Sequence, residues 1–235
     1  MRAAVQTEVR ASPVSGDVHR LRAQVDRMQG RRLDAPVLPA LPALAALLPG
    51  GGLRAGSAYS IAPSASLLSA LLAAPSQAGS WCGVVGVPQF GAEAAEKLGV
   101  DLSRLVLIPE PGSRWLAVTA TIAEVLPVVA LRPGGRATDG EVSRLAARLR
   151  DRGAVLLVQG PWAQAEAVID VAQPEWTGLG QGHGYLSGRE LTVSVTTRRT
   201  PVPRRGRVLL PAVDGALEPL RTPAEARYVP LEAVG

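Results

Sequence analysis

The sequence predicts an α/β protein built on a mostly parallel, twisted sheet that is flanked by helices and extended by antiparallel strands toward the C-terminus. Between residues 58 and 158, short runs that are apolar on both faces alternate with helical stretches, as in a parallel sheet covered on both sides. After Pro161 this alternation stops, which favours antiparallel strands over a further crossover. With 235 residues, 47% of them hydrophobic, the chain can bury the core that such a sheet requires.

Three segments are expected: a basic helix with a proline-rich connector (1–46), the core (47–200) and an arginine- and proline-rich segment (201–235). Apolar residues recur at helical spacing from Asp17, the expected N-cap, to Met28. This helix could pack on its own domain, on a neighbouring copy or on another protein. The prolines of residues 31–49 favour an extended connector that lies across the domain with its apolar side chains buried.

The core is predicted to begin with a strand at Ala58–Ile61 and a helix, capped by Ser64 or Ser66, that ends near Ala74 and is buried because it is apolar nearly all round. The further strands of the parallel part are predicted at Cys82–Val87, Leu105–Ile108, Val128–Leu131 and Ala154–Val158. The helices between them are predicted at Ala92–Leu98, Arg114–Leu126 and Asp139–Arg152. Two later strands, Ala167–Val171 and Glu190–Thr197, are separated by the glycine-rich loop Gly178–Gly188.

The composition limits the classes of protein that fit. A formal charge of +5 and a pI near 10.3 suit an acidic partner, such as nucleic acid or an acidic protein tail. However, Lys97 is the only lysine, and a GC-rich genome also produces such an excess of arginine. Cys82, the single cysteine, excludes an intrachain disulfide and is expected as a buried thiol in a reducing cytoplasm. No signal peptide or membrane span is recognised, so a cytoplasmic protein is expected.

Residues 47–74 have the local plan of a phosphate-binding loop: a glycine-rich entry, a strand, a tight turn and a helix. A working loop of the form G-x-x-x-x-G-K-[ST] needs two glycines, so that the backbone can approach phosphate, and a lysine that neutralises it. Between Ala62 and Ser69 these residues are missing, and only Ser69 is of a suitable type. The scaffold is therefore expected to have lost its nucleotide site.

Three stretches carry a resemblance to a known family: PGGGLRAGSAYSIAPSASLLSALL, EKLGVDLSRLVLIPEP (Glu96 to Pro111) and VSRLAARLRDRGAVLLVQG. They are similar to the phosphate-loop region of RecA, to the segment after its catalytic glutamate region, and to the helix and strand before its first DNA-binding loop. The chain thus resembles the RecA-like family over roughly residues 47–160. Within it, the chain resembles the degenerate ImuA-type mutagenesis factors, including the actinobacterial form called ImuA-prime.

The resemblance also locates the lost groups. The positions of the two glycines, the lysine and the magnesium-binding hydroxyl fall on Ala62, Leu67, Leu68 and Ser69. Val87 stands where the recombinases carry the glutamate that activates water, and the strand ending at Leu131 lacks the acidic residue that helps to position magnesium. Because all these functions are lost together, the chain is expected to be no ATPase and to bind no cofactor or metal. Leu67, Leu68, Leu71 and Leu72 are expected to fill the core instead.

What the family implies is a non-catalytic RecA-like adaptor in the SOS response to DNA damage. Such a factor assembles an error-prone translesion synthesis complex with a catalytically inactive Y-family polymerase homologue (ImuB-type) and, through it, with an error-prone replicative-type DNA polymerase. Direct binding to DNA and self-association are compatible with this role. The expected location is the cytoplasm, with association to the nucleoid after damage.

Two alternatives remain open. The chain could be a residual nucleotide- or DNA-dependent ATPase that binds ATP in an unorthodox way through Ser64, Ser66 and Ser69. It could also be a DNA-binding module or an inhibitor of cell division, whose proteins share the degenerate core. Binding of ATP with magnesium, salt-dependent binding of DNA and binding to a tubulin-like division protein distinguish these possibilities.

Arginines are the best candidates for contact with a partner or nucleic acid, since guanidinium groups hold phosphates and carboxylates bidentately. The candidates are Arg20, Arg22 and Arg27 on the N-terminal helix and Arg198, Arg199, Arg204, Arg205 and Arg207 near the C-terminus. A solvated charged edge that blunts sheet pairing explains the second cluster equally well. His19 and His183 lack neighbouring metal ligands, and most of the four tryptophans are expected to be core anchors.

Overall fold

The computed structural model describes residues 35–177, 188–198, 200, 202–212 and 217–220. The chain divides into two units, Met1–Ala35 and Pro36–Gly235, and nearly all described residues belong to the second. The predicted helix at Asp17–Met28, the two histidines and most of the Gly178–Gly188 loop lie outside the described residues. Every helix and strand of the described residues belongs to the second unit.

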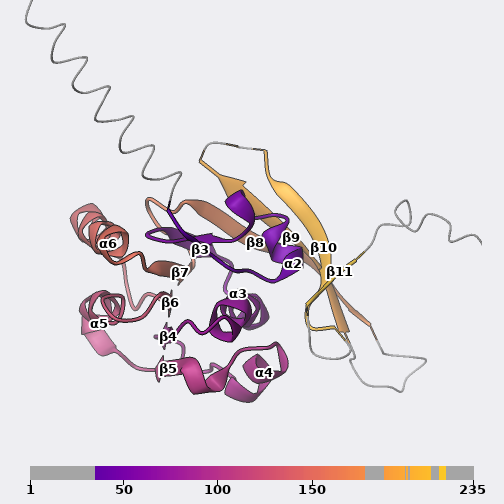
Figure 1. Ribbon diagram of the computed structural model, residues 1–235, viewed down its shortest axis with the longest axis horizontal. Helices are drawn as coiled ribbons and strands as arrows, with labels where there is room; N and C mark the ends of the chain where they lie inside the picture. The colour runs from indigo at the N-terminus through magenta and orange to yellow at the C-terminus, as the bar shows by residue number, and fades with distance from the viewer. Residues whose placement is uncertain (1–34, 178–187, 199, 201, 213–216, 221–235) are drawn as a thin grey trace, which may run out of the picture. The chain divides into compact units, whose positions relative to one another are not determined.

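The main strands, in chain order, are β3 (Ala58–Ile61), β4 (Cys82–Val85), β5 (Leu105–Ile108), β6 (Val128–Leu131), β7 (Val155–Gln159), β8 (Ala167–Thr177), β9 (Gly188–Thr197), β10 (Arg204–Leu209) and β11 (Glu218–Pro219). Within the described residues they form one sheet in the order β11-β10-β9-β8-β3-β7-β6-β4-β5 (Figure 1). All pairs from β8 to β5 are parallel, and the pairs from β8 to β11 are antiparallel. The predicted fold class is confirmed.

The helices are α2 (Pro42–Ala45), α3 (Ala65–Gln77), α4 (Ala92–Lys97), α5 (Trp115–Ile122) and α6 (Asp139–Arg152), with short 3-10 helices at Pro49–Gly51, Leu102–Arg104 and Gly112–Arg114. α2, α3 and α4 contribute to one hydrophobic cluster, and α5 and α6 contribute to a second. Successive residues of the short parallel strands alternate between these clusters, so both faces of that part of the sheet are covered (Figure 1). This explains why their sequences are apolar throughout.

The proline-rich connector is part of the folded unit. β1 (Val37–Leu38) pairs antiparallel with β2 (Leu53–Arg54), and Leu44 of α2 is buried in the core. Gly52 allows the close approach of this hairpin, since a side chain there would meet the carbonyl oxygen of Leu38. Over its described residues the connector therefore packs on the core with Leu44, Leu47 and Leu48 buried and Leu38 and Leu41 partly buried, although Pro42–Ala45 is helical where an extended segment was expected.

The C-terminal part differs from the sequence-based expectation in two ways. The strand predicted at Ala167–Val171 continues to Thr177, because pairing with β9 resumes after an irregularity between Ala172 and Glu175. Residues 204–209, expected in an appended segment, form β10 because their backbone pairs with β9 along its length. The composition of residues 201–235 predicted an appended segment without a strand. The backbone of β9 supplies the hydrogen-bond partners that make residues 204–209 a strand.

Candidate functional site

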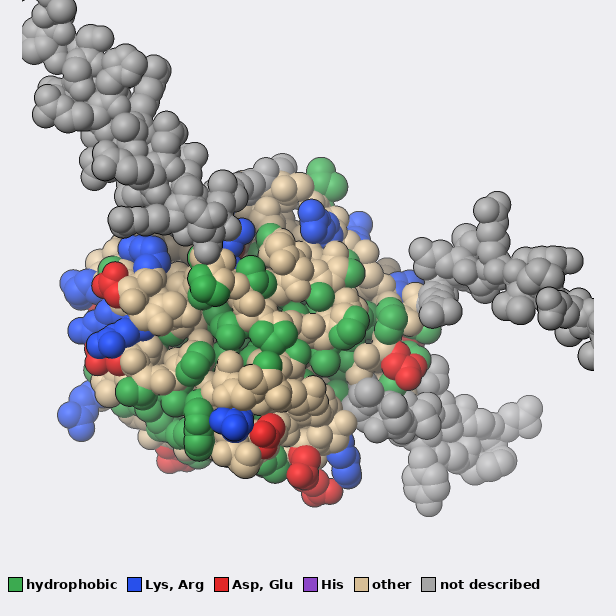
Figure 2. Space-filling model, viewed as in Figure 1, with side chains coloured by type: hydrophobic (Ala, Val, Ile, Leu, Met, Phe, Trp, Pro, Cys, Tyr) green, Lys and Arg blue, Asp and Glu red, His purple; other side chains and the backbone are tan. Residues whose placement is uncertain are grey.

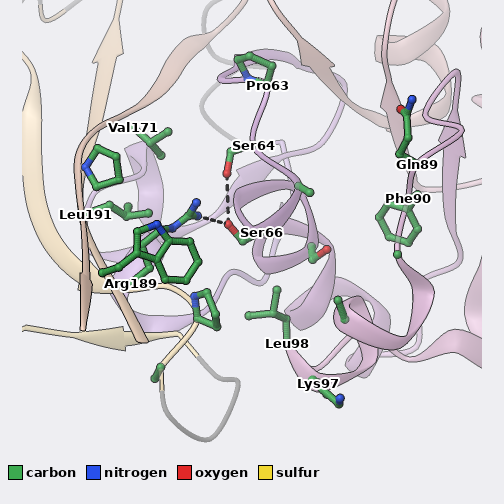
Figure 3. Close-up of a pocket in the computed structure, with 18 of the residues that line it drawn as sticks. Pro63, Ser64, Ser66, Gln89, Phe90, Lys97, Leu98, Val171, Arg189 and Leu191 are labelled. Carbon is green, nitrogen blue, oxygen red and sulfur yellow. Dashed lines mark hydrogen bonds between the residues drawn. The ribbon is translucent and has the colours of Figure 1, made fainter. Parts of the chain in front are cut away.

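A pocket of about 880 Å³ lies beside the N-terminus of α3, where the carboxyl ends of β3 and β4 face the far part of β8. Figure 3 shows Ser64 and Ser66 between Arg189 on one side and Gln89 and Phe90 on the other. The volume of the pocket is within the range of sites that hold small molecules or peptide side chains. Crevices at the carboxyl ends of parallel strands are the usual binding place in open α/β sheets.

The connection between β3 and α3 is short and forms the floor of this pocket. It consists of Ala62, Pro63 and Ser64, whose hydrogen-bonding groups are mostly paired within the protein. The amide of Ala62 donates to Ile169 O (2.9 Å), and that of Ser64 donates to Ala62 O (2.7 Å). Ser64 Oγ caps α3 by accepting from the amide of Leu67 (3.3 Å), so Ser64 is the cap that the sequence offered as one of two choices.

The residues at the degenerate phosphate-loop positions have separate fates. Leu67 and Leu68 lie in the first turns of α3 and are fully buried, together with Leu71 and Leu72, as expected. Ser69 is 4% exposed and lines the pocket, whereas Ala62 packs partly buried against the core. α3 therefore starts directly after Ser64, and its leucines anchor its first turns in the core.

The two other positions implied by the resemblance carry apolar side chains in the structure. Val87, just after β4, is partly buried and packs against the first cluster. Leu131, the last residue of β6, is fully buried in the second cluster. Neither side chain can accept a proton or ligate a metal, so these positions serve packing.

Arg189 dominates the chemistry of the pocket. Its guanidinium donates to Ser66 Oγ, which in turn lies 3.2 Å from Ser64 Oγ (Figure 3). Its Nε donates to Leu210 O at 3.0 Å, and its Cζ lies 5.4 Å from the ring centroid of Trp176, the residue opposite it on β8. Burial lowers the pKa of Arg189, yet a guanidinium keeps its charge at neutral pH. The pocket therefore contains a fixed, partly desolvated positive charge.

The rim combines apolar and polar groups. Phe90 is partly buried, Gln89 is exposed, and Trp176 is 51% exposed. Lys97 also lines the pocket, but its ammonium pairs with Glu93 (3.1 Å), one turn earlier on α4. Of the described residues that line the pocket, none carries a carboxylate. The site therefore offers an apolar surface around one arginine and favours an anionic group.

The arginines singled out from the sequence do not meet at this pocket. Arg198, Arg204, Arg205 and Arg207 are exposed, and Arg207 is ion-paired with Glu190 of the neighbouring strand. Arg20, Arg22, Arg27 and Arg199 lie outside the described residues. A separate gathering of positive side chains covers the side of the sheet where α6 lies (Figure 2). Its exposed members include Arg144, Arg148, Arg150 and Arg152.

Arg189 was missed in the sequence, although a signal exists. It shares the period of two with Leu191, Val193 and Val195, which are all buried on one face of β9. An arginine in phase with buried residues is expected to find a partner inside. The expectation that most of the four tryptophans are core anchors is wrong for two of them. Trp176 lies at the rim of the pocket, and Trp81 (44% exposed) lies at the surface just before β4.

Neither a metal cluster nor a membrane span emerges from the part of the chain that the structure describes. No group of three or more His, Cys, Asp or Glu side chains is placed there to hold a metal ion. In the same residues, no helix has both the length and the apolar character needed to cross a bilayer. Cys82 is buried, and desolvation raises the pKa of its thiol to about 12, so it is an inert core residue.

Comparisons with known proteins agree with this architecture. The model of the family described as the MT3502 N-terminal domain matches residues 46–164, about half of the chain. The uncharacterized protein Rv3395c of Mycobacterium tuberculosis (strain ATCC 25618 / H37Rv) is 37% identical over 120 residues, which are 49% of this chain and 59% of that protein. The match therefore spans less than two thirds of the relative's length.

Among solved structures, the RadB recombinase is similar in fold. It superposes with a TM-score of 0.58 over 76% of this chain and 97% of the recombinase, at 15% identity. This similarity confirms the RecA-like fold that the sequence resemblance implied. Of the two walls of the pocket, the one that carries Trp176 and Arg189 lies beyond the residues that the family model matches.

Proposed function

The chain belongs to the MT3502 N-terminal domain family and has a RecA-like fold, and from this premise we propose that it is a non-catalytic adaptor in mutagenesis induced by DNA damage. In this role it joins an inactive Y-family polymerase homologue of the ImuB type and, through it, an error-prone replicative-type polymerase. The proposed place of action is the cytoplasm, at the nucleoid after damage.

The altered phosphate loop is the observation that carries this proposal. α3 begins directly after Ser64, and the side chains at the second glycine and lysine positions, Leu67 and Leu68, are fully buried in the core. Burial of two leucines fixes this turn as helix, since exposing them to remake a loop would cost several kcal/mol, about 2 for each side chain. A RecA-like scaffold maintained without this loop is suited to holding surfaces for other proteins.

Joint purification tests the proposal. The full chain is expressed together with the polymerase homologue from the same genome, and the mixture is analysed by gel filtration with light scattering. We expect a complex of defined mass that persists at about 0.5 M salt. At about 0.1 M salt the Debye length is already about 10 Å, so a complex held only by exposed charges should dissociate at the higher concentration. Two folded proteins that elute separately, at concentrations well above micromolar, contradict the proposal.

Calorimetry with ATP and magnesium provides the second arm. We expect no saturable heat, because Lys97 at the pocket is paired with Glu93 and the amides of Ala62 and Ser64 already donate within the protein. Tight binding that depends on magnesium contradicts the non-catalytic assignment and favours a residual ATPase. In that case, measurement of phosphate release with and without single-stranded DNA decides between a nucleotide sensor and an enzyme.

A further inference from the structure

The pocket beside α3 has more specific chemistry than a vacated nucleotide site. Its described lining holds one inward-facing arginine, two aromatic residues and three prolines, Pro63, Pro174 and Pro211. We propose that it docks a segment of the partner protein in which a carboxylate side chain lies next to an apolar or aromatic one. The inference rests on the proposed adaptor function and assigns the surface through which the partner is held.

Arg189 supplies the anionic half of this recognition. A guanidinium has five N–H donors, and within the described residues Ser66 Oγ and Leu210 O occupy two of them. The remaining donors can hold a carboxylate, and the contacts to Ser66 and Trp176 fix the plane in which it must approach. Because the arginine is already ordered and partly desolvated, little conformational entropy is lost when the ligand binds.

The apolar half comes from both walls. Leu98 and Phe90 lie on the α4 side, and Val171, Trp176 and Leu191 lie on the side of β8 and β9. Trp176 is half exposed, so an apolar side chain placed against it would bury surface that is now in water. A pocket of about 880 Å³ accommodates a few side chains of a peptide rather than a whole folded surface.

Charge and donor supply favour a carboxylate over a polyphosphate. Pro63 has no amide hydrogen, the amides of Ala62 and Ser64 donate within the protein, and that of Leu67 donates to the cap, which leaves only the amides of Ala65 and Ser66 from the first turn of α3. Lys97, the other cation at the pocket, is paired with Glu93. One arginine matches the single charge of a carboxylate, whereas a nucleotide phosphate chain needs a cradle of backbone amides and further cations.

The open rim indicates a ligand that continues beyond the pocket. Gln89 and Trp176 are both exposed at the edge, so the pocket encloses only part of what it binds. This is the geometry expected when a short anchor of a longer chain enters, with neighbouring residues lying on the surface. A free small carboxylate would leave most of the apolar walls uncovered.

The test uses the full chain and overlapping fluorescein-labelled 15-residue peptides that tile the polymerase homologue. Fluorescence anisotropy is expected to find a peptide with Asp or Glu next to an aromatic residue or leucine. Arg189→Gln should weaken its binding at least about tenfold, and so should neutralising its carboxylate, with no further loss when both changes are combined. Trp176→Ala should weaken it by a similar factor, and its half-exposed position keeps the fold unaffected. Arg152→Gln, an exposed arginine at the end of α6 that does not line the pocket, is the matched control and should change affinity less than about twofold.

The outcomes separate the inference from the function on which it rests. If the full-length proteins form a complex that Arg189→Gln and Trp176→Ala leave unchanged, the pocket assignment is wrong and the adaptor function stands. If no complex and no peptide binding are found, both are wrong. If ATP with magnesium or a dT15 oligonucleotide displaces the peptide with micromolar affinity, the pocket is a nucleotide or DNA site and the peptide assignment is overturned.

Discussion

The parallel and antiparallel parts of the sheet bury their side chains differently. The strands β3, β7, β6 and β4 are short, parallel and covered on both faces, so consecutive residues such as Val128 and Val129 are both fully buried. In β8 and β9 the strands are longer and antiparallel, and burial alternates: Ile169 is fully buried, while Val168 is 47% exposed. The parallel part therefore depends on its helices, whereas the antiparallel part has an open face.

The difference matters for function because the pocket spans the junction of the two parts. Its α3 and α4 wall belongs to residues matched by the family model, and its β8 and β9 wall lies beyond them. Arg189 reaches from the antiparallel wall to Ser66 on the parallel one. Stability and recognition can thus be tested separately on the two parts.

The largest expected effect comes from emptying the helix-covered side. Leu71→Ala in α3 removes a fully buried side chain and leaves a cavity, which should lower the free energy of unfolding by about 3 kcal/mol. Urea denaturation followed by circular dichroism measures it. Leu107→Ala on the edge strand β5, where the side chain is 40% exposed, should cost less than about 1 kcal/mol. Equal losses would contradict the burial of α3 in the core.

A valine-to-threonine pair tests the contrast between the two parts directly. Val129→Thr places a hydroxyl in a dry interior and should cost about 2 kcal/mol in the same urea assay. Val168→Thr places it on the open face of β8 and should change stability by less than about 0.5 kcal/mol. If Val168→Thr is as costly as Val129→Thr, another element covers the open face.

The loss of stability at alkaline pH should reveal the burial of Cys82 in the parallel part of the sheet. Burial raises the pKa of Cys82 from 9.0 to about 12, so the neutral thiol of the folded state contributes stability below pH 9 that is lost progressively as pH rises toward 12. Urea unfolding between pH 7 and 11, stepped in about half units, should show a decline of at most about 1.4 kcal/mol per pH unit for each such group. Cys82→Ala should flatten the decline between pH 9 and 10.

Tyr59 provides the internal control for that experiment. Burial, the largest cause, raises its pKa from 10.0 to about 12, although the amide of Arg54 donates to its hydroxyl at 2.8 Å. Its contribution is therefore lost only above pH 10, and Tyr59→Phe should flatten the decline there alone. A decline that is unchanged in both variants would mean that neither group titrates differently in the folded and unfolded states.

The smallest expected effect lies at the start of α6. Thr138 Oγ1 accepts from the amide of Glu141 (3.3 Å), and the Glu141 carboxylate accepts from the amide of Thr138 (2.8 Å), which closes a capping box. Thr138→Ala should cost about 1 kcal/mol in urea denaturation. Thr138→Ser keeps the hydroxyl and should remain within about 0.5 kcal/mol of the wild type. Full loss in the serine variant would show that the threonine methyl group, rather than the cap, carries the effect.

The sequence predicts the parallel part of the sheet better than the antiparallel part. The strands Ala58–Ile61, Leu105–Ile108 and Val128–Leu131 and the helix Asp139–Arg152 were predicted with their bounds, since short apolar runs and a single helical stripe are local signals. The strand Arg204–Leu209 was not predicted, because its arginines are compatible with a strand only when β9 supplies the partner backbone.

The site was only half predicted, and the reason is also physical. The apolar character of α3 is a property of consecutive residues, so the burial of Leu67 and Leu68 and a cap at Ser64 or Ser66 could be inferred from residues 47–74 alone. The wall formed by β8 and β9 could not be inferred, because no local pattern in the sequence shows which distant residues pack beside these strands.

By itself, the sequence determined the layered parallel core and the buried helix that follows the first core strand, because side-chain polarity and spacing act locally. Only the tertiary structure decided that Arg189 meets Ser66, 123 positions earlier in the chain, beside the indole of Trp176. Antiparallel pairing sets the register that places Trp176 opposite Arg189, and the parallel pairing of β3 with β8 brings that pair to the start of α3. Long-range register therefore builds a pocket with one fixed positive charge beside the start of α3.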